Sequence, residues 1–508
     1  MVIIRIADLS ENKIDLLMNQ VNHTISPLPS AGPGGWRFQT SYLSLPDCFY
    51  ARVQPVPVRA PRLVLLNERL ASELGLDPGE LRNGQSAIFA GNQLPPGATP
   101  LAQAYAGHQF GHFTKLGDGR AIVLGEHVTD DGRRVDVQLK GSGQTPFSRR
   151  GDGRAVLGPM LREYIISEAM YALGIPTTRS LAVAATGEPV FRETPLPGAV
   201  LTRVATSHIR VGTFQYAAVC GRDTVQALID HTIQRHYPDC AQAENPAAAL
   251  LAHVVERQAE LIARWMLVGF IHGVMNTDNM AISGETIDYG PCAFMNAYDP
   301  ATVFSSIDAR GRYAYGNQPQ IALWNLARFA GTLLPFLHKD QDQAVAQAES
   351  ILDRFPALYH SHWLTGMRRK LGWEEERDGD EDLILELLKW MQANQVDYTS
   401  FFVDYSESGE TYSDADFQAW YQRWQQRSEQ ESNPPEQRLA LMHSVNPVVI
   451  PRNHLVEAAL LAAQAENDLE PTWELLHRLQ NPYQREGVPA KYREPGSPDP
   501  DYCTYCGT

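Results

Sequence analysis

HGVMNTDNMAISGETIDYG, at residues 272–290, has the residue order of a loop that binds phosphate together with a metal ion. Asn279 offers an amide oxygen and Asp288 a carboxylate, and a hard cation such as Mg²⁺ or Mn²⁺ prefers such oxygen ligands. Asp278 lies directly before Asn279 and could accept a proton. His272 is more typical of a structural histidine than of a metal ligand. The segment therefore predicts a metal-dependent phosphate site.

Lys140 and Glu163, earlier in the chain, are expected to form an ion pair that binds phosphate. Lys140 ends the strand-like RVDVQLK, and Glu163 lies in GPMLREYIISEAMYALGIP, whose apolar residues have helical spacing. Protein kinases use a lysine and a glutamate in this order, although singly such residues are usually exposed. Val274 occupies the place of the kinase base, so Asp278, four residues further on, is the candidate substitute.

The pentapeptide GDGRA occurs twice, at 117–121 and 151–155. In the first copy, Gly117 and Gly119 would let the backbone approach a phosphate, and Arg120 would add charge. The second copy precedes the helix, so its amides and the helix N-terminus form a candidate anion site. A single GDG is as typical of a hairpin turn. Two copies beside arginines in one region favour phosphate binding.

The distribution of β and helical patterns predicts an α+β, bilobal fold. Residues 1–35 contain SPLPSAGPGG and are expected to be an extension, and residues 36–205 are expected to form a β-rich N-lobe. In that lobe, SLAVAA and PVFRE are expected to be two strands around a TG turn. Residues 206–484 have repeated helical periodicity and are expected to be an enlarged helical C-lobe. The charge run at 374–382 is expected to be a solvated loop, and the Pro-rich tail at 485–508 is expected not to pack.

Composition limits the class of protein. The chain has 508 residues, 44% of them hydrophobic, and a formal net charge of −16, which argues against a general nucleic-acid or anionic-membrane binder. Neither a secretory leader nor a long apolar run is visible, so a cytoplasmic protein is expected. Six cysteines are too few for a disulfide framework in a chain of this size.

At this point the chain resembles a known family, the selenoprotein O family of protein adenylyltransferases with a kinase-like fold. The matching segments are AGHQFGHFTKLGDGRA, VQLKGSGQTPFSRRGDGRAVLGPMLREY, HGVMNTDNM, IDYGPCAFM and NPVVIPRNH, together with the cysteine-containing tail. The resemblance implies that ATP binds in a flipped orientation and that AMP is transferred to Ser, Thr or Tyr of a protein substrate while pyrophosphate leaves. A reversed nucleotide would explain why Val274 is tolerated.

The resemblance also implies roles for particular residues. Asp278 would be the proton acceptor, Asn279 and Asp288 would hold Mg²⁺ or Mn²⁺, and Lys140 would pair with Glu163. The residues expected to line the nucleotide, besides that pair and Asp288, are Gly117, Gly119, Arg120, Asp152, Gly153, Arg203 and Arg210.

The C-terminal Cys503 and Cys506 keep the family's Cys-x-x spacing, with sulfur in both places. A redox pair, or a disulfide from Cys506 to Cys292, is what the resemblance implies, and two solvated thiols in a reducing cytosol are the alternative. A conventional ATP-dependent kinase and an inactive nucleotide-binding scaffold are the other functions that the motifs allow. The protein substrates, the oligomeric state and the role of residues 1–35 leave no signal in the sequence.

Overall fold

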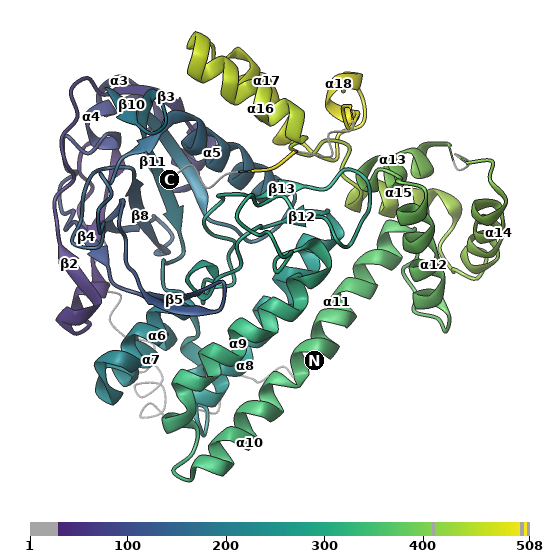
Figure 1. The fold of residues 1–508 in the computed structure, drawn as a ribbon, viewed down its shortest axis with the longest axis horizontal. Helices are drawn as coiled ribbons and strands as arrows, with labels where there is room; N and C mark the ends of the chain where they lie inside the picture. The colour runs from purple at the N-terminus through teal and green to yellow at the C-terminus, as the bar shows by residue number, and fades with distance from the viewer. Residues whose placement is uncertain (1–28, 409–411, 498–501, 505–508) are drawn as a thin grey trace, which may run out of the picture.

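The computed structural model describes residues 29–408, 412–497 and 502–504. The protein is α+β: a large antiparallel sheet is followed along the chain by a long series of helices (Figure 1). The described strands have the order β2-β4-β7-β8-β11-β10-β3, with β1 paired to β7 and β9 paired to β11. The strands of this sheet are β1 (Phe38–Gln39), β2 (Tyr50–Arg52), β3 (Arg62–Leu66), β4 (Leu101–Gln103), β7 (Ala121–Val128), β8 (Arg134–Lys140), β9 (Ala155–Val156), β10 (Arg179–Phe191) and β11 (Pro195–Ala205).

One sequence expectation about this sheet is wrong. The TG dipeptide does not separate two strands, because β10 runs through it as one strand paired along its length with β11. The pairing shifts register between Ala185 and Pro189, which marks a β-bulge, and Gly187 adopts φ +71° within it. A bulge absorbs the unusual backbone conformation of the glycine without ending the strand.

Helix α5 (Leu157–Ala172) is buried on nearly all sides. One side packs against β10 and β11, and the other packs against α16 (Asn453–Leu461) and α17 (Glu470–Leu479), which cross above it in Figure 1. An ion pair between Arg162 and Glu457 joins α5 to α16. Since helices from the end of the chain cover the sheet-bearing part, the expected division at residue 205 stays a prediction.

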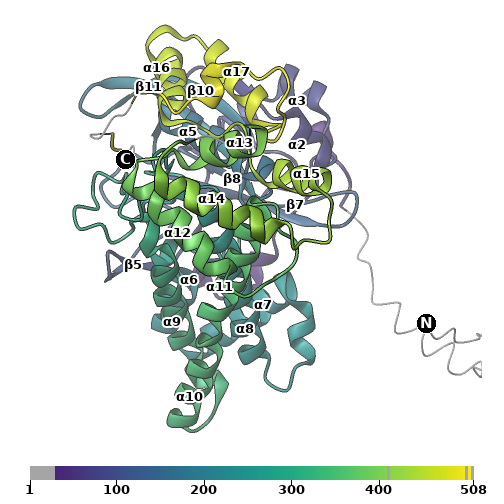
Figure 2. The ribbon, with the colours of Figure 1, turned by 90° about the vertical axis from the view of Figure 1, so that its right-hand side faces the viewer.

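The short helices α2 (Glu68–Glu73) and α4 (Ser86–Phe89) contact the sheet. Most of the later helices form the other part of the molecule, in which α8 (Pro246–Leu267) packs along α9 (Gln318–Leu337) and α11 (Arg354–Lys370) (Figure 2). Two small two-stranded sheets and a 3₁₀ turn contact these helices: β5 (Ala106–Gln109) pairs with β6 (His112–Lys115), β12 (Phe270–Ile271) pairs with β13 (Ala293–Phe294), and η6 (Thr277–Asn279) lies in the loop between β12 and β13. The other helices are α3 (Pro78–Gly84), α6 (Val211–Cys220), α7 (Arg222–His236), α10 (Gln341–Leu352), α12 (Asp380–Ala393), α13 (Tyr398–Ser408), α14 (Ala415–Ser428), α15 (Pro435–Val445) and α18 (Ala490–Arg493).

Two expectations about solvated segments are only partly confirmed: residues 374–379 are an irregular and mostly exposed loop as expected, but the end of that run and part of the tail are packed. In the charge run, Asp380 is buried at the start of α12, where Arg368 and Arg427 bind its carboxylate. In the tail, Tyr492 is buried and Thr504 pairs with Ser305 in a parallel bridge. Buried ionic partners from distant helices compensate for the polar composition in the first case. Among the described helices, none is both long enough and apolar enough to cross a bilayer.

Candidate active site

The predicted ion pair between Lys140 and Glu163 is present and buried. The Lys140 Nζ lies 2.6 Å from a carboxylate oxygen of Glu163 and 3.1 Å from Asp288 Oδ1. Strand β8 ends at Lys140 and α5 presents Glu163 from beneath the sheet, so the two meet because the helix packs on the strands. Burial lowers the pKa of Lys140, and the neighbouring Arg203 acts in the same direction.

Asp288 is held by three cations. Arg203, on β11, places one guanidinium nitrogen 2.5 Å from Asp288 Oδ1 and also pairs with Glu163. Arg210, just before α6, approaches Asp288 Oδ2 at 3.5 Å. Burial alone would raise the pKa of Asp288, but Arg203, Lys140 and Arg210 hold that pKa well below its usual range. The sequence predicted all five residues for the site, and the structure brings them together.

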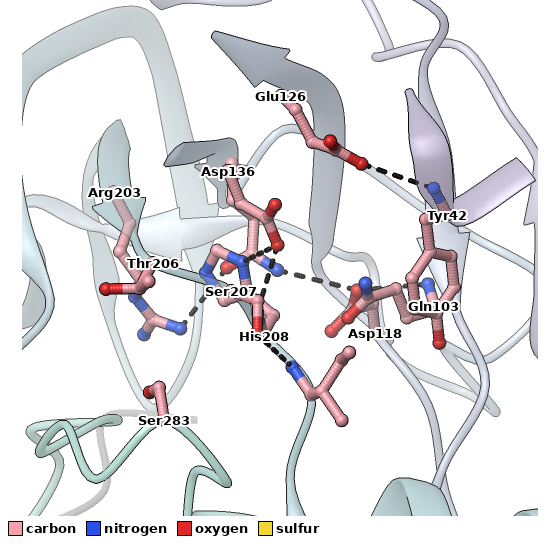
Figure 3. Close-up of polar contacts among 12 residues, drawn as sticks. Tyr42, Gln103, Asp118, Glu126, Asp136, Arg203, Thr206, Ser207, His208 and Ser283 are labelled. Atoms are coloured by element: carbon pink, nitrogen blue, oxygen red, sulfur yellow. Dashed lines mark hydrogen bonds and ion pairs between the residues drawn. The ribbon is translucent and has the colours of Figure 1, made fainter. Parts of the chain in front are cut away.

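A line of polar side chains under the sheet fixes Arg203 from the other side. Arg203 donates to Gln138 on β8, and Gln138 donates to Asp118. Asp118 also accepts from the backbone amide of Gln103, which lies beside it in Figure 3. Asp118 is 3% exposed, and burial raises its pKa. Because each member of the line comes from a different strand or loop, the guanidinium of Arg203 has little freedom to turn away from Asp288.

The segment after β11 is anchored by a second polar contact. Asp136 Oδ2 accepts from both the backbone and the Nδ1 of His208, and Figure 3 shows the two side chains facing each other. Arg235, from α7, pairs with the other oxygen of Asp136 at 3.0 Å. This arrangement fixes the chain directly before Arg210.

The catalytic-loop candidates occupy η6 and its flanks. Asp278 is 8% exposed, and burial raises its pKa to about 6. Asn279 donates its amide to the Val274 carbonyl at 2.9 Å, which leaves its side-chain oxygen for another partner. His272 is buried, and its Nε2 lies 2.9 Å from the Ile287 carbonyl, so it ties the two halves of the loop together as a structural residue.

The hairpin β5–β6 lies over the catalytic loop. The His108 amide donates to Thr277 Oγ1 at 2.7 Å, and the Phe110 amide donates to Asn276 Oδ1 at 3.1 Å. A Cβ at Gly107 would lie 2.1 Å from Asp278 Oδ1, so the glycine lets the strand pass directly over the carboxylate. Sequence reasoning gave this hairpin no role, although its AGHQFGHF repeat of glycines and histidines was visible.

Several buried polar atoms in this space lack hydrogen-bond partners among the described residues. They include Arg210 Nη2 and Asp278 Oδ1, together with Tyr42 Oη and His208 Nε2 nearby. Arg210 stacks 4.4 Å above the ring of Tyr105, which holds the guanidinium in place. Buried polar groups are nearly always satisfied, so such a set indicates a missing polar ligand. A nucleotide phosphate with its metal ion fits these donors and acceptors.

The two GDGRA turns pack against neighbouring loop residues. Gly117 faces Phe147, whose Cγ would lie 2.4 Å from an added Cβ, and the Gly119 carbonyl accepts from Ser148. Arg120 is close enough for its charge to lower the pKa of Lys140. In the second copy, an added Cβ at Gly153 would meet the Gly143 carbonyl. The turn is therefore packed against its own loop.

Asp152 pairs with Arg192 at 2.9 Å on the surface, and among the described residues no hydrogen bond or ion pair joins Asp152 to Lys140. Of the predicted nucleotide-lining set, Arg203 and Arg210 thus join the buried cluster, whereas the described contacts of Gly117, Gly119, Asp152 and Gly153 are with neighbouring loops and with Arg192.

The redox candidates are only partly described. Cys292 is fully buried, and burial raises its pKa to about 12. Cys503 is half-buried, and Cys506 lies outside the described residues. Thr504 donates to the Pro291 carbonyl at 2.8 Å, which places the tail beside Cys292.

Comparison with known proteins identifies the family of the chain. A family model described as "Protein adenylyltransferase SelO" matches residues 35–480. The protein named "Protein nucleotidyltransferase YdiU" from Geobacillus kaustophilus is 58% identical over 481 residues, which are 93% of this chain and 99% of the relative. The proteins of the same name from Brevibacillus brevis and Alkaliphilus metalliredigens are 57% and 58% identical over 487 and 481 residues, which are 94% and 93% of this chain and 99% and 98% of the relatives. The chain therefore belongs to the SelO family of protein adenylyltransferases.

Proposed function

We propose that this protein transfers AMP from ATP to Ser, Thr or Tyr hydroxyls of protein substrates, on a bilobal fold of the protein-kinase type. One observation carries the proposal: the buried cluster of Lys140, Glu163, Arg203 and Asp288 lies next to Asp278, a carboxylate with a raised pKa. A phosphate-binding cluster beside a poised base suits nucleotidyl transfer to a hydroxyl.

In this reaction the hydroxyl oxygen forms a bond to the α-phosphorus, and the bond between that phosphorus and the β-phosphate oxygen breaks. Asp278 takes the hydroxyl proton, and pyrophosphate leaves. Lys140, Arg203 and Arg210 neutralise the phosphate charge, and their fixed positions mean that little reorganisation is needed as the charge develops. We assign Gly117, Gly119, Arg120, Asp152 and Gly153 to the edge of the nucleotide site.

Asn279 and Asp288 would hold a divalent cation, Mg²⁺ or Mn²⁺. Their amide and carboxylate oxygens suit either ion, with phosphate oxygens and water completing the coordination. When bound, the cation neutralises charge on the phosphates. The hydrogen bond from the Asn279 amide nitrogen to the Val274 carbonyl restrains the side chain and leaves its oxygen for a cation.

We further propose that the tail regulates activity through a disulfide between Cys292 and Cys506. Thiol–disulfide exchange with oxidised glutathione would form it, and the glutathione would be reduced to two thiols. The docking of Thr504 on Pro291 supports this proposal, since it brings the tail to the loop that carries Cys292. Oxidised and reduced wild type should then differ in activity, whereas Cys506→Ser should show no difference.

The test of the main proposal uses ATP labelled at either the α- or the γ-phosphate, a divalent cation and a cell extract. Protein label from the α-position alone, with pyrophosphate released, is expected for wild type and should be lost in Asp278→Asn. Asp416→Asn, an exposed aspartate on α14, serves as the matched control and should behave as wild type. Label from the γ-position alone would establish a kinase instead, and label from neither would refute both activities.

A further inference from the structure

A group of aromatic and cationic side chains beside the catalytic loop has no role in the proposed chemistry. Trp324, half-buried on α9, is contacted by two guanidinium groups: the Cζ of Arg312 lies 5.0 Å and the Cζ of Arg328 lies 5.2 Å from its ring centre. His108 meets the same ring edge-on at 5.4 Å, and Phe113 packs against His108 at 5.4 Å. We call these five residues the Trp324 shelf.

The shelf is attached to the catalytic loop at two points. The His108 amide donates to Thr277, the residue before Asp278. On the other side, Tyr313 follows Arg312, and its hydroxyl donates to Asn276 Oδ1 at 2.6 Å. A chain bound on the shelf would therefore lie next to the candidate base rather than at a remote surface.

The two arginines of the shelf lack acidic partners. In the described parts of the chain, no ion pair joins Arg312 or Arg328 to a carboxylate, and Arg312 Nε is buried without a hydrogen-bond acceptor. The nearby Asp308 uses its carboxylate on the backbone amides of Arg312 and Tyr313. Since the whole chain carries a formal net charge of −16, two uncompensated cations held side by side are a specific local feature.

The composition of the shelf is that of a protein-binding surface. Phe113 is 46% exposed, and Ile307, in the loop before Arg312, is 55% exposed. Aromatic residues and arginine are enriched in the centres of protein interfaces, where they carry most of the binding energy. Stacking on Trp324 holds both guanidiniums in place, which reduces the entropy lost when they bind a partner.

We propose that the Trp324 shelf docks an acidic segment of the substrate protein and so presents the adjacent acceptor hydroxyl to Asp278. Carboxylates of the segment would pair with Arg312 and Arg328, while its apolar side chains cover Phe113. The proposal rests on the proposed function, because it assigns a substrate class to the same site. All five side chains of the shelf belong to described residues, so the docking surface needs no metal ion or cofactor.

The test measures binding separately from AMP transfer. Three fluorescent peptides carry the same Ser acceptor, flanked by Glu, Gln or Lys, and their binding to the full-length protein is followed by anisotropy. Wild type should bind the Glu peptide most tightly, and raising the salt concentration should weaken this binding. In the double variant Arg312→Glu/Arg328→Glu, affinity for the Glu peptide should fall by about tenfold or more, and the Lys peptide should become the preferred ligand.

Two controls separate charge recognition from misfolding. Arg222→Glu changes another exposed arginine that stacks on an aromatic ring, that of Phe336, at the opposite end of α9, and it should leave peptide binding unchanged. Arg312→Gln/Arg328→Gln should remove the preference for Glu over Gln without creating one for Lys. All variants should bind a fluorescent ATP analogue as wild type does.

The outcomes distinguish this inference from the proposed function. Equal binding of the three peptides by wild type, or a Glu preference that survives both double variants, would overturn the shelf proposal even if AMP transfer occurs. A Glu preference that the variants abolish, in a protein that transfers no AMP to any substrate, would retain the shelf and refute the activity.

Discussion

At the scale of single residues, we expect Asp288 and the nucleotide phosphates to compete for the same three cationic side chains. In the described structure Asp288 binds Lys140, Arg203 and Arg210, which are the groups that we expect to meet phosphate. The carboxylate thus satisfies buried positive charges until the nucleotide arrives with its own negative charge. On the proposed function, Asp288 would then be released to hold the metal ion.

This competition predicts that Asp288→Ala binds metal-free ATP more tightly than wild type, although it transfers no AMP. Removing the carboxylate frees Lys140 and Arg203 for the phosphates, and we expect an increase of about tenfold in affinity, or about 1.4 kcal/mol. The measurement is a titration with a fluorescent ATP analogue in the presence of a chelator. Weaker binding by the variant would show that Asp288 does not compete with phosphate.

The raised pKa of Asp278 predicts how the reaction rate depends on pH. Its pKa is raised to about 6 by burial, and only the ionised carboxylate accepts a proton. We therefore expect kcat/KM to rise with pH and to reach half of its maximum near pH 6. A flat profile between pH 5 and 8 would exclude Asp278 as the base.

The same raised pKa affects stability. The pKa of Asp278 is higher in the folded state than in the unfolded state. Ionised Asp278 therefore destabilises the folded state, and this cost is fully present above pH 6. Asp278→Asn should therefore be more stable than wild type at pH 7 by about 3 kcal/mol, and the difference should fall below about 1 kcal/mol near pH 4. Urea unfolding at the two pH values measures this.

At the scale of elements, the hairpin β5–β6 and helix α5 both act on the site through packing. The hairpin covers Asp278 and is held by backbone hydrogen bonds to Thr277 and Asn276. Helix α5 carries Glu163 and is enclosed between the sheet and α16–α17. Rigid elements on both sides keep the charged groups in a fixed geometry.

The close contact between Gly107 and Asp278 predicts that one added methyl group at position 107 strongly lowers kcat. Gly107→Ala would place a Cβ 2.1 Å from Asp278 Oδ1, so the hairpin or the carboxylate must move. We expect kcat to fall by about a hundredfold, with little change in the free energy of unfolding. Gly111→Asn at the hairpin tip is the control, since an added Cβ meets no atom there and Asn tolerates its φ of +88°. Unchanged kcat in Gly107→Ala would mean that the hairpin opens during turnover.

At the scale of the whole molecule, burial of charge in the helical part limits stability. Lys370, at the end of α11, is 3% exposed and contacts the rings of Tyr398 and Phe402 at 5.3 and 4.1 Å. Burial lowers its pKa to about 7. The unfolded chain therefore binds more protons than the folded chain between pH 7 and the ordinary lysine pKa.

Lys370→Met should accordingly stabilise the protein, by about 3 kcal/mol at pH 7 after allowing for the lost ring contacts. The gain should shrink as the pH rises towards 10, where wild-type Lys370 and its unfolded counterpart are both increasingly neutral. Chemical denaturation at pH 7 and 9.5 measures the difference. Lys389→Met, at an exposed position on α12, should show no such trend.

The sequence by itself determined the order of the main strands and helices and of the candidate site residues along the chain. Local periodicity indicated β8, α5 and β11, and the succession of Lys140, Glu163, Asp278 and Asp288 indicated phosphate chemistry. The predictions of β8, α5 and β11 are confirmed, because strand and helix patterns repeat over a few residues. The turn at TG was wrong because a bulge lets β10 continue as one strand. The charge run is solvated as expected except at Asp380, which distant arginines bind.

Only the tertiary structure decided which charges meet. Lys140 and Asp288 are 148 positions apart, and His108 and Thr277 are 169 apart. Neither the three cations on Asp288, nor the hairpin over Asp278, nor the stacking of Arg312 on Trp324 leaves a local pattern. Such contacts arise when the buried faces of remote elements pack together, and periodicity reports that a face is buried without reporting its partner.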